Sequence, residues 1–274
     1  MIKALPLLDK NVLVPRSREQ AKSFSKLVEE YGGIPVEIPL IAFRPLEKNQ
    51  YFDACLSRLE RYDWIIFTSN TTVETFFSFV KAEAKLPKIA VIGKRTEAAL
   101  KEKAVPVEFV PSVYVAETFV EEFNPYVHEG SRVLLPKGNL ARDYIGLSLA
   151  KAGAEVDEVV IYENYLPEES RRKLAEALSR RQLDILTFTS PSTVDHLMAV
   201  VRENGLLEQL NGCIIGCIGP VTEKRLREYG LPIHASPKQY TVKEMLKSLA
   251  EFLEEQGPSL TDAIGQKKRS SDHN

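Results

Sequence analysis

The sequence repeats itself, and this repetition restricts the possible folds more than any other feature of its 274 residues. Four blocks occur twice in the same order, 121 residues apart in the first two pairs (11 to 132, 67 to 188) and 126 apart in the later two (92 to 218, 105 to 231). Their order and spacing indicate an internal duplication. The paired blocks are 11–16 with 132–137, 67–73 with 188–194, 92–97 with 218–223, and 105–114 with 231–240.

Each half alternates short apolar runs with longer amphipathic segments. Residues 12–14, 64–67 and 89–92 are rich in β-branched or other large apolar side chains, and they predict strands. Residues 18–31 and 71–80 carry apolar side chains at helical spacing, and they predict helices. Alternation of this kind predicts a doubly wound α/β fold, in which helices cover both faces of parallel sheets.

Glycines mark two of the expected helix ends. Gly32 and Gly153 follow predicted helices in the two halves, at a place where a left-handed residue is needed. The alternating pattern stops after Gln256, where a polar segment begins with Gly257 and Pro258. We predict that residues 257–274 form a disordered tail.

The charge balance limits the partners that the chain can have. Lys and Arg number 36 against 38 Asp and Glu, and the sequence lacks the basic excess that is typical of proteins that bind nucleic acids. It contains neither an apolar run of about 18 residues nor an N-terminal signal peptide. We therefore expect a soluble, cytoplasmic monomer that binds neither nucleic acid nor membranes.

The cysteines and histidines have no spacing that is typical of a metal site. Two of the cysteines lie in one apolar run, and the histidines are scattered, so we expect reduced, buried thiols and no bound metal. The residues concerned are Cys55, Cys213, Cys217, His128, His196, His234 and His273.

Three pairs of equivalent turns, each between a predicted strand and a predicted helix, carry hydroxyl or basic side chains. In parallel sheets, ligands bind beyond the carboxyl ends of the strands, where helix N-termini present free N–H groups. Ser, Thr and Asn are also the preferred N-caps of any helix, so a single hydroxyl is weak support for binding. Six such turns together would suit a flexible small molecule with several anionic groups. They are 15–18 with 136–139, 68–70 with 189–192, and 93–96 with 219–222.

Sequence motifs of several common enzyme classes are missing. No G-x-G-x-x-G follows a predicted strand, and the sequence has no phosphate loop of the form G-x-x-x-x-G-K-[ST]. It also lacks the G-x-S-x-G turn of α/β-hydrolases. A dinucleotide-dependent enzyme, a P-loop NTPase and a serine hydrolase of this type are therefore not indicated.

The order of these segments resembles the uroporphyrinogen-III synthase family. Each piece alone is weakly specific, but together they extend over residues from about 10 to about 255. The matching pieces are 13–16, 39–41, 67–69, 135–139 before Arg142, 160–163, 189–192 and 218–222.

The resemblance implies two α/β lobes joined by two extended linkers, with the active site between the lobes. The first lobe would comprise residues 1–37 and 168–256, and the second lobe residues 44–160. The linkers would be 38–43 and 161–167. The repeats alone would divide the chain near residue 125, so this division rests on the resemblance.

The resemblance also implies a substrate and a reaction. The family acts on hydroxymethylbilane, a linear tetrapyrrole with eight carboxylates, which agrees with a site for a polyanion. It closes the ring with loss of water and inversion of ring D, without a metal or an organic cofactor. A transient hand-over of substrate from hydroxymethylbilane synthase would follow.

Individual residues receive roles through the same resemblance. Tyr162 matches the tyrosine that is proposed to assist departure of the hydroxyl, and a phenol keeps its proton at neutral pH and can donate it. Tyr165 is near enough to be the alternative. Val221 stands where many members have a hydroxyl, and Thr71 with Thr72 also departs from the family pattern. The substrate-binding candidates are Arg16, Thr68, Ser69, Thr96, Lys137, Gly138, Asn139, Arg142, Ser190, Pro191, Ser192, Gly219 and Thr222.

Two other functions would suit the same pattern. A two-lobed binding module could close on an anionic metabolite without turnover, since a fold does not determine a function. An enzyme that acts on phosphorylated sugars would also need an anion site. The sequence shows no carboxylate or histidine constellation that would support the second alternative.

Overall fold

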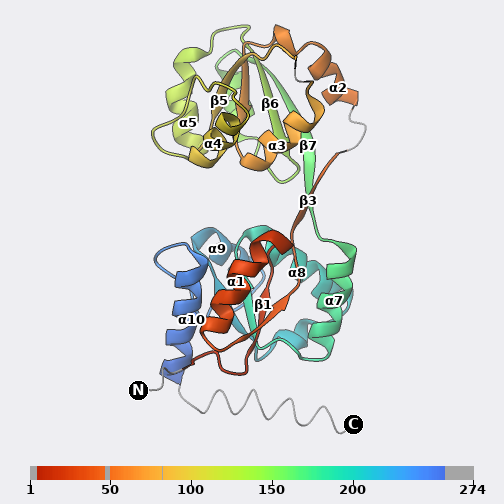
Figure 1. Ribbon diagram of the computed structural model, residues 1–274, viewed down its shortest axis with the longest axis vertical. Coiled ribbons are helices and arrows are strands. Elements are labelled where there is room, and N and C mark those ends of the chain that lie inside the picture. The colour runs from red at the N-terminus through yellow and green to blue at the C-terminus, as the bar shows by residue number, and fades with distance from the viewer. Residues whose placement is uncertain (1–4, 47–49, 82, 257–274) are drawn as a thin grey trace. The chain divides into compact units, whose positions relative to one another are not determined.

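The computed structural model describes residues 5–46, 50–81 and 83–256. The tail for which we predicted disorder, 257–274, lies outside the described residues. The chain divides into two compact units (Figure 1). Unit 1 contains the residues up to Ala42 and from Tyr165 onward, and unit 2 contains Phe43–Asn164. Each unit has its own sheet, and the predicted α/β fold is confirmed.

The sheet of unit 1 has four strands in the order β2-β1-β8-β9. Every neighbouring pair in it is parallel, and β1, β8 and β9 are largely or fully buried, as expected for a sheet covered on both faces. The strands are β1 (Asn11–Val14), β2 (Ile34–Glu37), β8 (Ile185–Phe188) and β9 (Ile214–Cys217).

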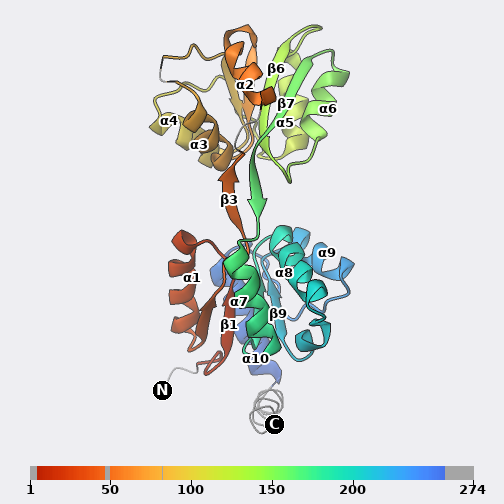
Figure 2. The ribbon, with the colours of Figure 1, turned by 90° about the vertical axis from the view of Figure 1, so that its right-hand side faces the viewer.

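Helices cover both faces of this sheet (Figure 2). Val12 and Val14 of β1 pack in the core under α1 and α10, whereas Leu13 packs in the core under α7, α8 and α9. This alternation follows from the two-residue period of a strand. The helices are α1 (Arg18–Glu30), α7 (Glu168–Ser179), α8 (Pro191–Glu203), α9 (Pro220–Glu228) and α10 (Val242–Gln256), and a 3-10 helix spans Leu207–Leu210.

The sheet of unit 2 has five strands in the order β3-β7-β6-β4-β5. The pairs β7-β6, β6-β4 and β4-β5 are parallel, and β3 lies at the edge beside β7. The strands are β3 (Ala42–Pro45), β4 (Trp64–Phe67), β5 (Lys88–Val91), β6 (Arg132–Gly138) and β7 (Glu155–Tyr165).

Unit 2 is also covered on both faces. Ile65 and Phe67 of β4 pack in the core under α2, α3 and α4, and Trp64 and Ile66 pack in the core under α5 and α6. The helices are α2 (Gln50–Ser57), α3 (Asn70–Phe79), α4 (Lys94–Glu102), α5 (Ala116–Phe123) and α6 (Tyr144–Lys151), and 3-10 helices span Leu59–Arg61 and Asn124–Tyr126.

The repeated blocks occupy equivalent places in the two sheets. The order β2-β1-β8-β9 in unit 1 corresponds to β7-β6-β4-β5 in unit 2, with each segment replaced by its counterpart from the other half. Unit 1 therefore combines β1 and β2 from the first half with β8 and β9 from the second half. Unit 2 combines β4 and β5 from the first half with β6 and β7 from the second half. Isolated bridges 126 residues apart, Ala90 with Phe109 and Gly216 with Ala235, extend the correspondence. A division near residue 125, as the repeats alone suggested, would cut through unit 2.

One local expectation needs correction. We placed Lys137 and Gly138 in a turn, but β6 continues through Gly138 and α6 begins only at Tyr144. The segments predicted as extended linkers overlap two strands, because 38–43 contains the start of β3 and 161–167 contains the end of β7. The predicted left-handed helix ends are confirmed, since φ is +86° at Gly32 and +97° at Gly153.

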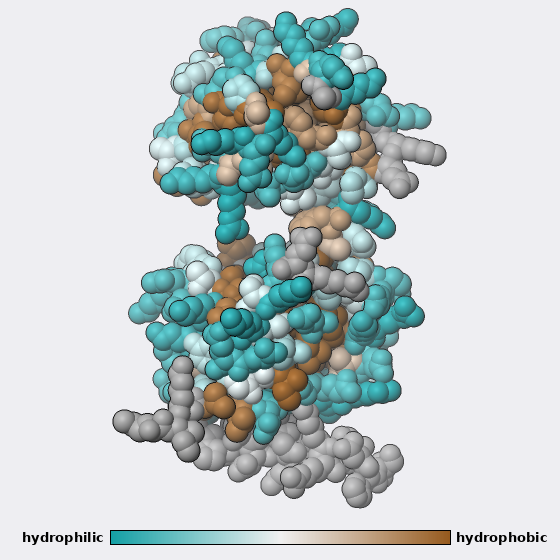
Figure 3. Space-filling model, in the orientation of Figure 1, coloured by the Kyte–Doolittle hydropathy of each residue, from teal (hydrophilic) through white to brown (hydrophobic). Residues whose placement is uncertain are grey.

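Polar and charged residues cover much of each unit in the view of Figure 3. Within the described part of the chain, no helix is both long enough and apolar enough to cross a membrane.

Replacement of Gly153 by Ala should destabilise unit 2. A left-handed backbone costs a residue with a side chain about 1–2 kcal/mol, and the added Cβ would lie 3.1 Å from Glu129 Cα. Gly130→Ala is the matched control, because Gly130 also has positive φ but its Cβ would meet nothing within 4 Å. Urea unfolding should show a larger loss for Gly153→Ala. An equal or smaller loss would show that the contact with Glu129 adds nothing to the backbone strain.

Candidate functional site

The parallel strands of unit 1 bring three predicted turns to one edge of its sheet. Arg16 follows β1, Ser190 follows β8, and Gly219 follows β9. Because all three strands are parallel, these residues lie at the common carboxyl edge. Helices α1, α8 and α9 begin from the same turns and direct their first N–H groups toward this edge.

Unit 2 brings the corresponding turns together at the carboxyl edge of its own sheet. Thr68 and Ser69 follow β4, Thr96 lies in the first turn of α4 after β5, and Gly138 ends β6. The parallel pairs β4-β5 and β4-β6 place these segments along one edge. Unit 2 therefore carries seven of the thirteen predicted binding residues, and unit 1 carries the other six.

Tyr162 lies at the centre of the best-defined cluster in unit 2. It pairs with Gly138 across β6 and β7, where the register shifts. The Tyr162 hydroxyl is 3.5 Å from Ser69 Oγ, and the ring of Phe43 contacts the Tyr162 ring edge-on at a centroid distance of 5.8 Å. The structure thus joins the predicted catalytic tyrosine to two predicted binding residues.

Gly138 makes room for the tyrosine ring. A Cβ atom at residue 138 would lie 2.5 Å from Tyr162 Cζ and 2.7 Å from its hydroxyl oxygen, far inside van der Waals contact. Tyr165, the alternative tyrosine, is the last residue of β7 and belongs to unit 1. This geometry favours Tyr162 as the tyrosine of the unit 2 site.

Lys137 is buried in β6 and is held by two carboxylates. Its ammonium lies 2.5 Å from Asp143 Oδ1 and also contacts Glu158. Burial would lower the pKa of Lys137, but the hydrogen bonds to Asp143 and Glu158 outweigh it and raise the pKa above the usual lysine value. Lys137 is therefore a fixed positive charge at neutral pH.

A small pocket of about 250 Å³ gathers three of the predicted residues in unit 2. Thr68, Lys137 and Arg142 line it together with apolar side chains such as Leu135 and Ile145. The Arg142 guanidinium lies 3.2 Å from the carboxylate of Glu117, and both side chains are exposed. Two cationic side chains and a hydroxyl therefore line this pocket, and both cations are paired with carboxylates.

Several predicted hydroxyls also have local structural roles. Thr96 is buried and donates to the Ile92 carbonyl at 3.1 Å, and Thr222 is buried as well. Ser69 accepts from the Thr72 amide at 3.1 Å and so caps α3, and Ser190 forms a capping box with Thr193 at the start of α8. A ligand at these turns would meet backbone N–H groups more than threonine side chains.

The remaining predicted residues have partners as well. Asn139 joins the end of β6 to β7, because its side-chain oxygen accepts from the Asn164 amide at 2.8 Å. Arg16 donates to Gln20 Oε1 at 2.8 Å, and the Ser192 hydroxyl lies 3.1 Å from that of Ser190. Pro191 is the first residue of α8, where its missing N–H costs little.

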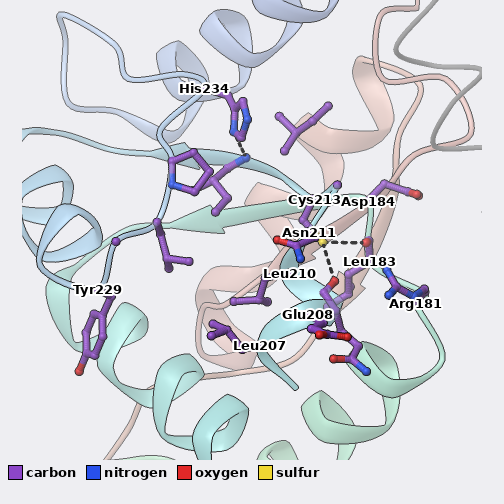
Figure 4. Close-up of a pocket in the computed structure, with 17 residues that line it drawn as sticks. Arg181, Leu183, Asp184, Leu207, Glu208, Leu210, Asn211, Cys213, Tyr229 and His234 are labelled. Atoms are coloured by element: carbon purple, nitrogen blue, oxygen red, sulfur yellow. Dashed lines mark hydrogen bonds between the residues drawn. The ribbon is translucent and has the colours of Figure 1, made fainter. Parts of the chain in front are cut away.

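A larger pocket lies elsewhere, at the amino ends of β8 and β9 (Figure 4). It has a volume of about 620 Å³, and its lining includes Leu183, Cys213, Tyr229 and His234. The residues that line it within the described chain include none of the predicted site residues. The polar turns, the helix N-termini and Tyr162 lie instead at the carboxyl edges of the two sheets.

In the part of the chain that the structure describes, the metal-binding residue types do not gather into a site. Within residues 5–46, 50–81 and 83–256, no group of three or more His, Cys, Asp or Glu side chains is placed to hold a metal ion. The three cysteines, Cys55, Cys213 and Cys217, all lie in the described part of the chain, are buried and form no disulfide bond.

The residues that position Lys137 and Tyr162 were not predicted from the sequence. Asp143 and Glu158 hold the ammonium, and Phe43 supports the tyrosine ring. One signal was available: Lys137 interrupts an apolar strand, and a buried ammonium requires a carboxylate on a neighbouring element. Which acidic residue supplies it depends on the pairing of β6 with β7, which the local pattern does not contain.

Comparison with known proteins gives consistent matches. The profile of the family described as Uroporphyrinogen-III synthase HemD matches residues 22–247. A protein of Methanothermobacter thermautotrophicus, provisionally named a uroporphyrinogen-III synthase, is 33% identical over 86% of this chain and 96% of its own length. The uroporphyrinogen-III synthase of Synechococcus elongatus is 27% identical over 90% of this chain and 97% of its own. A mutant Thermus thermophilus uroporphyrinogen III synthase structure shares the fold, with a TM-score of 0.63 at 22% identity over 90% and 99% of the two chains.

Replacement of Ser69 by Ala should weaken unit 2 by about 1 kcal/mol, because it removes the side-chain cap of the Thr72 amide. Ser78→Ala, near the other end of α3, is the control, since the Ser78 hydroxyl only donates back to the Thr75 carbonyl. Urea unfolding should separate the two variants. Equal stabilities would show that the Ser69 hydroxyl is not needed as a cap.

Proposed function

The chain belongs to the uroporphyrinogen-III synthase family, and on that premise we propose that it is a lyase that converts hydroxymethylbilane to uroporphyrinogen III. The family match over residues 22–247 carries this proposal. The resemblance seen in the sequence is confirmed by that match. The reaction loses the terminal hydroxyl as water, inverts ring D and closes the macrocycle.

In this proposal Tyr162 assists departure of the hydroxyl. The leaving oxygen takes a proton, the carbon–oxygen bond breaks, and the electron pair leaves with water. The pyrrole nitrogen then stabilises the resulting azafulvene cation, which the crowded carbon of ring D attacks. The position of Tyr162 beside Ser69, with its ring in contact with Gly138 and Phe43, supports this role, because a proton donor must have a defined direction.

The proposed substrate-binding groups are the turns at the carboxyl edges of both units. In unit 2, Lys137, Arg142 and Thr68 line one pocket, and Ser69, Thr96, Gly138 and Asn139 lie at the ends of neighbouring strands. In unit 1, Arg16, Gly219 and Thr222 lie at the same edge as the start of α8 with Ser190, Pro191 and Ser192. Carboxylates would be bound by cations and by the N–H groups of helix N-termini.

We further propose that the protein acts as a cytoplasmic monomer that receives its substrate from hydroxymethylbilane synthase. Its substrate is unstable and closes without inversion when released, so a short path between the two enzymes would favour isomer III. In this proposal, residues 38–43 and 161–167 connect one lobe of 1–37 with 168–256 to a second lobe of 44–160.

The direct test uses the purified full chain with enzymatically generated hydroxymethylbilane, followed by oxidation and chromatographic separation of the uroporphyrin isomers. We expect mainly isomer III with the protein and isomer I without it. Isomer I alone in both samples would overturn the proposed function. It would then favour a binding module for an anionic metabolite.

Tyr162→Phe should reduce kcat by about a hundredfold with little change in KM, because general acid assistance contributes at least about that factor. Tyr165→Phe is the matched control and should keep kcat. Steady-state kinetics and isomer ratios measure both variants. If Tyr162→Phe keeps its kcat, Tyr162 is not the donor, and a loss in Tyr165→Phe would transfer the role to that residue.

Gly138→Ala should lower kcat through Tyr162, because the new Cβ would displace the tyrosine ring. Its effect should largely disappear in a Tyr162→Phe background, as for two changes that act on one group. Urea unfolding of Gly138→Ala checks that the variant is folded. If the two losses in kcat multiply in the double variant, Gly138 does not act through Tyr162.

A further inference from the structure

Lys137 differs from the other predicted binding cations because it is buried. Its side chain is only 10% exposed, and it lies within the apolar strand β6. Two carboxylates, Asp143 and Glu158, contact its ammonium. One positive charge therefore meets two negative charges inside unit 2.

The first carboxylate, Glu158, is a fixed partner. Its side chain is 21% exposed and lies under α6, beside Gly146. A Cβ at residue 146 would fall 1.5 Å from Glu158 Oε1, so the carboxylate occupies the space that the glycine leaves free. Packing under the helix holds Glu158 in place.

The second carboxylate, Asp143, is in a different environment. Its side chain is 69% exposed, although it lies 2.5 Å from the same ammonium. It is the N-cap residue of α6, yet its side chain makes no capping hydrogen bond. Because this carboxylate is exposed, water and salt screen its attraction to the buried ammonium and weaken the pair. Asp143 can therefore leave the ammonium at small cost, whereas Glu158 cannot.

Lys137 also borders a space that a ligand can enter. Lys137 lines the pocket of about 250 Å³ that Thr68 and Arg142 also line. As long as Asp143 and Glu158 both contact Lys137, the cluster carries an excess negative charge and disfavours a second anion. A carboxylate could bind there favourably only if it took the place of Asp143.

We propose that Asp143 is an exchangeable counter-ion, which a carboxylate of the substrate displaces from Lys137. This inference rests on the proposed function and identifies a residue that sets the strength and selectivity of substrate capture. Glu158 keeps the ammonium charged and in place during the exchange. No covalent bond forms or breaks in this step.

Exchange of this kind favours a ligand with many carboxylates. A single carboxylate competes with Asp143, which is attached to the same site and therefore has a high effective concentration. A ligand that is already held by its other carboxylates at neighbouring turns has the same advantage and can displace it. Asp143 thus weakens the binding of small monoanions more than that of a polycarboxylate.

Asp143→Asn tests the proposal, because the amide keeps the shape of the side chain and removes its charge, and no capping hydrogen bond is lost. Without the competing charge, KM for hydroxymethylbilane should fall by about two- to fivefold at low salt, the range expected from an exposed ion pair. kcat should not change. The dissociation constant of uroporphyrin III, a stable probe with the same eight carboxylates, should fall by a similar factor in a fluorescence titration.

Glu155→Gln is the matched control. Like Asp143→Asn, this substitution removes one negative charge and breaks an exposed ion pair, here between Glu155 and Arg132. Glu155, however, lies at the amino end of β7. The substitution should leave both constants unchanged. In a Lys137→Met, Glu158→Gln background, which removes the buried pair together, Asp143→Asn should have no effect.

The outcomes separate this inference from the proposed function. Unchanged or weaker uroporphyrin III binding in Asp143→Asn would overturn the exchange, even if the protein makes isomer III. Equal tightening in Glu155→Gln would also overturn it, because the effect would then come from overall charge. Tighter binding in Asp143→Asn without formation of isomer III would support the exchange and reject the proposed activity.

Discussion

The parallel pairing of β1 with β8 is the interaction on which the architecture of unit 1 depends. It joins Val12 to Ile185 and Leu13 to Leu186, across most of the chain. The buried Thr187 hydroxyl donates to the Leu13 carbonyl at 2.6 Å, and the Asp184 carboxylate accepts from the Asn11 amide at 2.8 Å. The segment between these strands contains all of unit 2, whose first and last strands, β3 and β7, are neighbours in its sheet. Folding of unit 2 therefore holds the leaving and returning chain together, which lowers the entropic cost of closing such a long loop.

The sequence predicted the elements well and their partners poorly, and the reason is physical. Helix and strand periodicity is local, so the strands near Val12, Trp64 and Ile89 and the glycine after α1 could be read directly. Pairing of strands is not local. Because the two halves resemble each other, β1 could equally pair with the β4 of its own half or with the equivalent β8, and no local pattern distinguishes these choices. Only the resemblance to a family with exchanged segments indicated the second arrangement, which the sheet orders show.

The candidate site was predictable in position and less so in detail. The sequence shows hydroxyl-rich turns after predicted parallel strands, and in such a sheet these turns lie at the carboxyl edge. Both carboxyl edges could therefore be predicted as binding edges. The contacts of Tyr162 with Ser69 and Phe43 could not be predicted from the sequence, because they join three segments that are distant from one another along the chain. Lys137 was placed in a turn because 136–139 is the repeat counterpart of 15–18, whereas β6 continues through Gly138 and the lysine is buried.

As the proposed binding groups, a strand lysine and backbone amides would share a physical advantage. Thr96 and Thr222 are buried, and Ser69 and Ser190 cap helices, so their side chains mainly hold the turns in shape. Helix N–H groups and a buried ammonium are already ordered before a ligand arrives, and little conformational entropy is lost when they bind it. An exposed lysine on a loop would lose rotamer freedom for the same contact. A flexible polyanion loses much entropy of its own when it is bound, so the rigidity of its binding groups decides how much of the electrostatic attraction remains as affinity.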